Sequence, residues 1–148
     1  MRILFAVFML MMARPAQDPW FGTWKLNPAK STTNSDRYKR VTSRIEPGED
    51  GLNVTYDMVG SRGGITHMEW SGKFDGKDYP VQGVDYVLTN AYTRLNDYSY
   101  QIVVKLDGAL VATTTVLLST DGRTLTTLTN EKNPQGQDAS MTTVYDKQ

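Results

Sequence analysis

The sequence predicts an all-β domain, in which an antiparallel up-and-down meander of about eight to ten strands closes into a barrel behind a signal peptide. Three observations predict it. Asp-Gly pairs recur at residues 50–51, 75–76, 107–108 and 121–122, and this dipeptide favours tight hairpin turns. The segments between these turns are rich in Val, Thr, Tyr and Ile and alternate between apolar and polar residues. No segment after the first 16 residues has the periodicity of an amphipathic helix.

The first 16 residues have the layout of a secretory signal peptide. Arg2 is followed by the apolar run Ile3 to Ala13, which is too short to span a bilayer, and then by small residues ending at Ala16. Cleavage after Ala13 is the alternative to cleavage after Ala16, and an uncleaved membrane anchor is the other interpretation. We expect a leader at 1–16, one barrel domain at 17–148 and a periplasmic or secreted mature protein without stable membrane insertion.

The alternating segments and their turns predict nine strands, near residues 20–27, 39–46, 52–59, 65–74, 84–95, 98–106, 109–119, 123–131 and 140–147. The segment KDYPVQG, residues 77–83, is either a further short strand or a bend, because Pro80 cannot donate to a central ladder. A long meander with one apolar face and no covering helix buries that face best by closing, which also removes the exposed edges. A two-sheet sandwich is the alternative, because its sequence pattern would look much the same.

Composition excludes several functional classes. Basic and acidic residues number 16 each, and loss of two arginines with the leader leaves a slight acidic excess, so nucleic acid is not an expected partner. The chain has one histidine and no cysteine, which provides no transition-metal site and no disulfide. We therefore expect no metal, no cofactor and a fold held by packing and backbone hydrogen bonds, acting as a monomer.

Both ends of the chain resemble a known superfamily. FGTWKL (Phe21 to Leu26) is similar to the first strand of the calycins, which include lipocalins and intracellular fatty-acid-binding proteins, and MTTVYDK (Met141 to Lys147) is similar to the closing strand of the latter. The segments GTWKLN and DGKDYPV also resemble small exported bacterial lipocalin-like proteins. The resemblance spans residues 19–147 and implies a lipocalin-like barrel in which Gly22 and Trp24 form a structural plug at the closed end.

The chain departs from fatty-acid-binding proteins at two places. Those proteins place an arginine two residues before the closing tyrosine to hold a carboxylate, whereas in this chain Thr143 precedes Tyr145. The segment between Asn27 and Tyr38 is too short and too turn-prone for their two-helix lid. The resemblance therefore implies a ligand-binding barrel without implying a fatty acid as its ligand.

The aromatic residues on the predicted inner face are the strongest candidates for a binding site. Aromatic rings that carry one polar tip suit a cavity with apolar walls, although they also suit a filled barrel, and both alternatives stay open. Asn90 shares the parity of Tyr92, and Arg94 would either meet an anion inside or reach water at the rim. The candidate ligand-binding residues are Tyr56, Met58, Met68, Trp70, Tyr92, Arg94, Tyr100 and Tyr145.

No catalytic residue is predicted. His67 and Glu69 lie two residues apart on the face opposite Met68 and Trp70, so we expect an exposed pair. The favoured hypothesis is an exported barrel that binds a small, mostly apolar ligand without catalysis. The alternatives are a filled barrel that binds another envelope protein through its outer surface, and an enzyme that polarises a carbonyl with interior tyrosine or arginine side chains.

Overall fold

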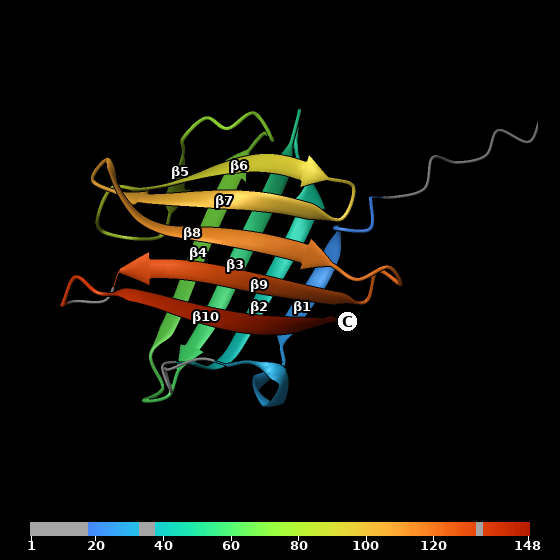
Figure 1. Ribbon diagram of the computed structural model, residues 1–148, viewed down its shortest axis with the longest axis horizontal. Helices are drawn as coiled ribbons and strands as arrows, with labels where there is room; N and C mark the ends of the chain where they lie inside the picture. Colours follow the sequence, from blue (N-terminus) through green and yellow to red (C-terminus); the bar gives the residue numbers. More distant parts are fainter. Residues whose placement is uncertain (1–17, 33–37, 133–134) are drawn as a thin grey trace, which may run out of the picture.

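The strands of the computed structural model close into a single antiparallel barrel (Figure 1). The structure describes residues 18–32, 38–132 and 135–148, so the expected leader at 1–16 lies outside the described residues. Within these ranges there are a short 3₁₀ turn, η1 (Pro28–Lys30), and ten strands. The strands are β1 (Gly22–Leu26), β2 (Tyr38–Pro47), β3 (Leu52–Gly60), β4 (Ile65–Gly72), β5 (Tyr79–Gln82), β6 (Leu88–Asn96), β7 (Ser99–Leu106), β8 (Ala109–Leu118), β9 (Thr124–Lys132) and β10 (Asp138–Lys147).

Each strand pairs with its sequence neighbour, and β10 returns to pair with β1. The closing contact places Trp24 opposite Lys147 and Leu26 opposite Tyr145. In Figure 1 the strands β6–β10 cross in front of β1–β4. The predicted all-β meander and its lipocalin-like closure are confirmed, and the sheet does not divide into the two layers of a sandwich.

All four Asp-Gly pairs lie in connections between strands, and one of them forms the two-residue hairpin turn that the dipeptide favours. Asp107 and Gly108 join β7 to β8 with φ of 49° and 81°, the left-handed pair that a tight hairpin turn requires. The segment KDYPVQG contains the short strand β5, in which Pro80 lies opposite Thr89 of β6. Because β5 makes only two register pairs with each neighbour, the missing N–H of Pro80 disturbs little of the ladder.

The hydrophobic core lies toward one end of the barrel, where β1 begins and the β4–β5, β6–β7 and β8–β9 connections lie; we call this the closed end. Trp70 and Tyr92 stack there with ring centroids 4.0 Å apart, and Tyr92 stacks on Tyr100 at 5.3 Å. Trp20 and Trp24 are fully buried beside them. In the described part of the chain, no helix is long and apolar enough to cross a membrane.

Candidate functional site

The half of the barrel away from the closed end is hollow. A cavity of about 420 Å³ lies there, and every strand from β1 to β10 contributes at least one side chain to its wall. Tyr38 lines the cavity and is 43% exposed, so the cavity reaches solvent at the end opposite the core. A volume of this size is typical of sites for small organic ligands. The barrel is thus filled at one end and hollow at the other, which combines the two alternatives that the sequence left open.

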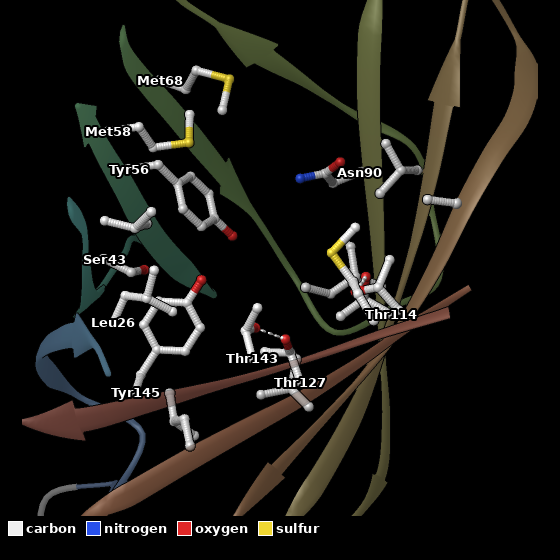
Figure 2. Close-up of a pocket in the computed structure, with 18 of the residues that line it drawn as sticks. Leu26, Ser43, Tyr56, Met58, Met68, Asn90, Thr114, Thr127, Thr143 and Tyr145 are labelled. Atoms are coloured by element: carbon white, nitrogen blue, oxygen red, sulfur yellow. Dashed lines mark hydrogen bonds between the residues drawn. The ribbon is translucent and has the colours of Figure 1, made fainter. Parts of the chain in front are cut away.

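The structure brings five of the candidate ligand-binding residues together around this cavity. They come from β3, β4, β7 and β10, and Figure 2 shows the hydroxyl groups of Tyr56 and Tyr145 pointing into the same space. Met58 and Met68 lie side by side on neighbouring strands, where their flexible side chains form an adaptable wall. The five are Tyr56, Met58, Met68, Tyr100 and Tyr145.

Trp70 and Tyr92 are inside the barrel but do not line the cavity. They are 1% and 0% exposed, and they fill the closed end as a stacked pair. The indole Nε1 of Trp70 donates to the backbone carbonyls of Tyr79 at 3.2 Å and Asn90 at 3.1 Å. Their parity was predicted correctly, but their depth along the barrel makes them core residues in this structure, not cavity residues.

Arg94 also lies outside the cavity, as a side chain at the closed end. Its side chain is 40% exposed and its guanidinium is 3.4 Å from a carboxylate oxygen of Asp18. The guanidinium carbon lies 4.7 Å from the centre of the Phe74 ring. The inclusion of Arg94 among the cavity residues is therefore corrected: it extends past the last buried layer of β6 to the rim and meets a protein carboxylate there.

The predicted plug residues lie where the cavity meets the core. Trp24 is 0% exposed, lines the cavity, and donates from its indole Nε1 to the carbonyl of Trp20 at 3.0 Å. The Lys147 ammonium lies 5.2 Å from the centre of the Trp24 ring. Gly22 has φ of +140°, and a Cβ there would lie 2.8 Å from Cε of Lys147. Glycine thus lets the Lys147 side chain pass close to the first strand and cover Trp24.

Burial keeps the cavity tyrosines in their neutral form. It raises the pKa of Tyr56 to about 12, and it holds the pKa of Tyr100 well above its ordinary value. Burial raises the pKa of Tyr145 as well. The Tyr56 hydroxyl lies 3.0 Å from the hydroxyl of Tyr92, so one of these two phenols donates a hydrogen bond to the other. Neutral phenols serve as hydrogen-bonding groups in the cavity and hold no negative charge against a ligand.

A threonine-rich wall on β8, β9 and β10 was not predicted. The hydroxyls of Thr114 and Thr129 are 2.9 Å apart, and those of Thr127 and Thr143 also bond to each other (Figure 2). Threonine is common in strands because of its β-propensity, so the presence of these residues in the strands does not by itself indicate a site. Their parity held the missing information, because Thr114 is two residues from the buried Val116 on the same strand.

Asn90 was also not predicted to line the site. It is 8% exposed, lines the cavity from β6, and Figure 2 shows its amide pointing into the hollow space. Its Oδ1 is buried and has no hydrogen-bond partner among the residues that the structure describes. A buried acceptor without a partner is uncommon in folded proteins and calls for an explanation.

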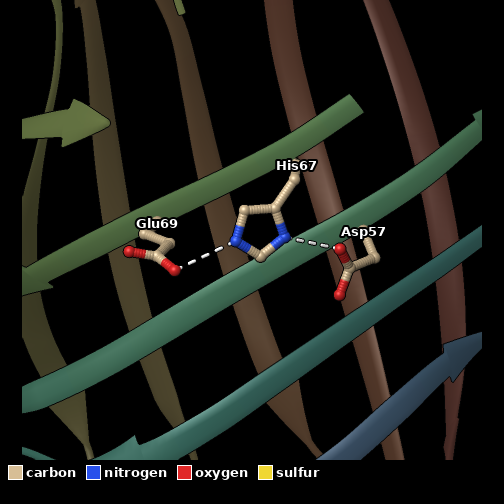
Figure 3. A network of polar contacts seen from close by, with 3 residues as sticks. All are labelled: Asp57, His67 and Glu69. Atoms are coloured by element: carbon tan, nitrogen blue, oxygen red, sulfur yellow. Dashed lines mark hydrogen bonds and ion pairs between the residues drawn. The ribbon is translucent and has the colours of Figure 1, made fainter. Parts of the chain in front are cut away.

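His67 lies on the outer face of the barrel, as predicted (Figure 3). Its Nδ1 is 2.6 Å from a carboxylate oxygen of Asp57, and its Nε2 is 3.0 Å from one of Glu69. The two carboxylates lie on opposite sides of the ring and do not converge. Across the described ranges, no group of three His, Cys, Asp or Glu side chains could hold a metal ion.

We expect the pKa of His67 to lie above its ordinary value of 6.5, because the hydrogen bonds that the ring makes to the carboxylate of Asp57 and, to a smaller extent, to that of Glu69 favour its charged form. These contacts therefore contribute fully to the stability of the folded protein below pH 6.5, and their contribution is lost as the pH rises through the raised pKa of His67. An NMR titration of the ring measures it directly, since His67 is the single histidine of the chain. Asp57→Asn is expected to lower the pKa more than Glu69→Gln does, and a pKa unchanged by both substitutions would contradict the network.

Comparisons with known proteins give likeness in structure but no match in sequence. No protein-family profile matches the chain, and no curated protein matches it. Among solved structures, the chain is similar to the one reported as "The Siderocalin Ex-FABP functions through dual ligand specificities", at 16% identity and a TM-score of 0.45. The match covers 88% of this chain and 71% of that one. The closed ten-strand meander itself is what makes the fold lipocalin-like.

Proposed function

We propose that the protein is an exported carrier, which holds one small and mostly apolar ligand in the hollow half of its barrel without changing it chemically. The observation that carries this proposal is the cavity of about 420 Å³, which is lined mainly by apolar and aromatic side chains. A ligand that covers these walls removes their apolar surface from water, which is favourable by roughly 25 cal/mol for each Å².

The arrangement of the barrel supports a carrier in two further ways. Tyr100 lines the end of the cavity nearest the core, and it stacks on Tyr92, which stacks on Trp70, so packed rings support the cavity wall at this end. The opposite end gives a ligand access at Tyr38. A rigid, preformed cavity reduces the entropy lost on binding.

The same geometry weakens the two alternatives. A filled barrel that acts only through its outer surface would not keep a hollow half of this volume. The enzyme hypothesis uses Arg94, Tyr92 or Tyr145 to polarise a bound carbonyl, but Tyr92 is inside the packed core and Arg94 is at the rim of the closed end. Only Tyr145 of the three lines the cavity.

A neutral fluorescent probe tests the carrier proposal. We expect Nile red to bind the purified domain saturably with one probe per chain, and to shift its emission to the blue because the cavity walls are apolar. The titration should be repeated with protein unfolded in denaturant, where the signal should disappear. Emission that grows linearly without saturation, or that is the same with unfolded protein, would mean surface adsorption and would remove the proposal.

A further inference from the structure

We propose that the ligand is an uncharged apolar molecule with a hydroxyl group, and that this hydroxyl bonds to the side-chain amide of Asn90 inside the cavity. This inference rests on the proposed carrier function and narrows it to a chemical class, exemplified by a long-chain alcohol.

The side chain of Asn90 carries an acceptor without a partner. The Oδ1 of Asn90 is buried without a described partner, while the residue is only 8% exposed in a wall that is otherwise mostly apolar. The backbone of Asn90 is held in place, because it pairs with Tyr79 and Val104 and its carbonyl accepts from the Trp70 indole. The amide therefore stays in the cavity wall. Oδ1 has almost no accessible surface where it lies, so rotation of the amide must turn it toward the cavity before a ligand can donate a hydrogen bond to it, and that bond then removes the cost of an unpaired acceptor.

Several neighbouring polar groups already take part in a hydrogen bond. Tyr56 bonds to Tyr92, which lies outside the cavity wall, and the threonine hydroxyls bond in pairs across β8, β9 and β10. The Oδ1 of Asn90, in contrast, has no described partner. The amide of Asn90 is left as the point at which a ligand gains most from carrying one polar group.

The charges in the cavity wall also restrict the ligand. Within the described residues, no lysine or arginine lines the cavity, and the one ionisable carboxylate in its wall belongs to Glu131. An anionic ligand would lose its hydration without gaining a cation, and it would also meet the negative charge of Glu131. The cavity therefore favours an uncharged molecule over a carboxylate of the same length.

The proposed hydrogen bond is the one that the ligand hydroxyl donates to Oδ1. Rotation of the amide exchanges Oδ1 and Nδ2, and only with Oδ1 turned toward the cavity does a hydroxyl gain over a group that can only accept. An ether or an ester can only accept. The comparison of an alcohol with its methyl ether therefore isolates the hydrogen bond that the alcohol donates.

Displacement of bound Nile red by decan-1-ol, decyl methyl ether and decanoate tests the inference. In the wild type we expect decan-1-ol to bind more tightly than decanoate at mildly alkaline pH. The ratio of alcohol to ether affinity should fall by about tenfold in Asn90→Leu, because leucine removes the acceptor and keeps the volume. The matched control is Asn53→Leu, the same substitution at an exposed asparagine of β3 that does not line the cavity, and it should change the ratio less than about twofold.

Each outcome separates this inference from the carrier proposal. If Nile red binds but the alcohol-to-ether ratio is the same in the wild type and in Asn90→Leu, the inference is wrong and the carrier proposal stands. If Nile red does not bind the wild type, both are wrong. A measurement without any variant covers the case in which Asn90→Leu does not fold: decan-1-ol should shift the side-chain amide NMR signals of Asn90, and an absence of that shift would overturn the inference.

Discussion

Trp24→Ala is expected to lower the free energy of unfolding by about 3–5 kcal/mol, as large-to-small changes at fully buried tryptophans do. Trp24 is 0% exposed, lies between the core and the cavity, and bonds through its indole to the carbonyl of Trp20. Alanine removes the ring that separates the packed end from the hollow end. Because the neighbouring strands are fixed by barrel closure, the space cannot collapse, and the loss should fall in the upper part of that range.

Denaturant unfolding measures this loss, with two variants for comparison. Trp24→Phe keeps an aromatic ring but loses the Nε1 donor, so its stability should lie between those of the wild type and Trp24→Ala. Lys25→Ala changes an exposed residue on the same strand and should alter stability by less than about 0.5 kcal/mol. Equal stability of Trp24→Ala and Lys25→Ala would show that Trp24 is not a structural plug.

The sequence predicted the fold well, because the information needed for it is local. Turn residues such as Asp107 and Gly108 and the alternation along each strand identify hairpins without knowledge of distant contacts. The resemblance of the first and last strands to calycins implied closure, and β1 pairs with β10. The segment around Pro80, which the sequence predicted as either a short strand or a bend, forms the shortest strand of the barrel.

The candidate site was predicted in part, because alternation reports which face a side chain occupies and not how deep along the barrel it lies. Tyr92 and Asn90 share one face of β6, yet Tyr92 is part of the packed stack and Asn90 lines the cavity. Depth depends on the register between strands, which closure of the whole barrel determines. Arg94 illustrates the same limit, because two residues beyond Tyr92 the barrel interior has already ended.

The unpartnered amide of Asn90 could not be found from the sequence for a different reason. An asparagine within an alternating strand is usually exposed or bonded, and only the three-dimensional neighbourhood shows that its Oδ1 is left without a described partner. The threonine pairs could not be found for a related reason. Threonine is common in any strand, and only the structure shows that these threonines line the cavity and bond to one another across three strands.

The second large effect concerns the hollow half itself. Thr114→Trp is expected to weaken Nile red binding more than about tenfold, because Thr114 projects into the cavity and an indole there occupies the space of the ligand. Thr113→Trp is the matched control. Thr113 is the adjacent residue of β8 and points to the outer face, so the same substitution leaves the cavity open.

The affinity of these two variants for Nile red, measured beside the wild type on folded protein, tests most directly whether the cavity of the barrel is the binding site. We predict that Thr113→Trp binds within about twofold of the wild type, whereas Thr114→Trp loses more than about tenfold in affinity. Equal affinity in all three proteins, or an equal loss in both variants, would place the probe elsewhere and would contradict a binding site inside the barrel.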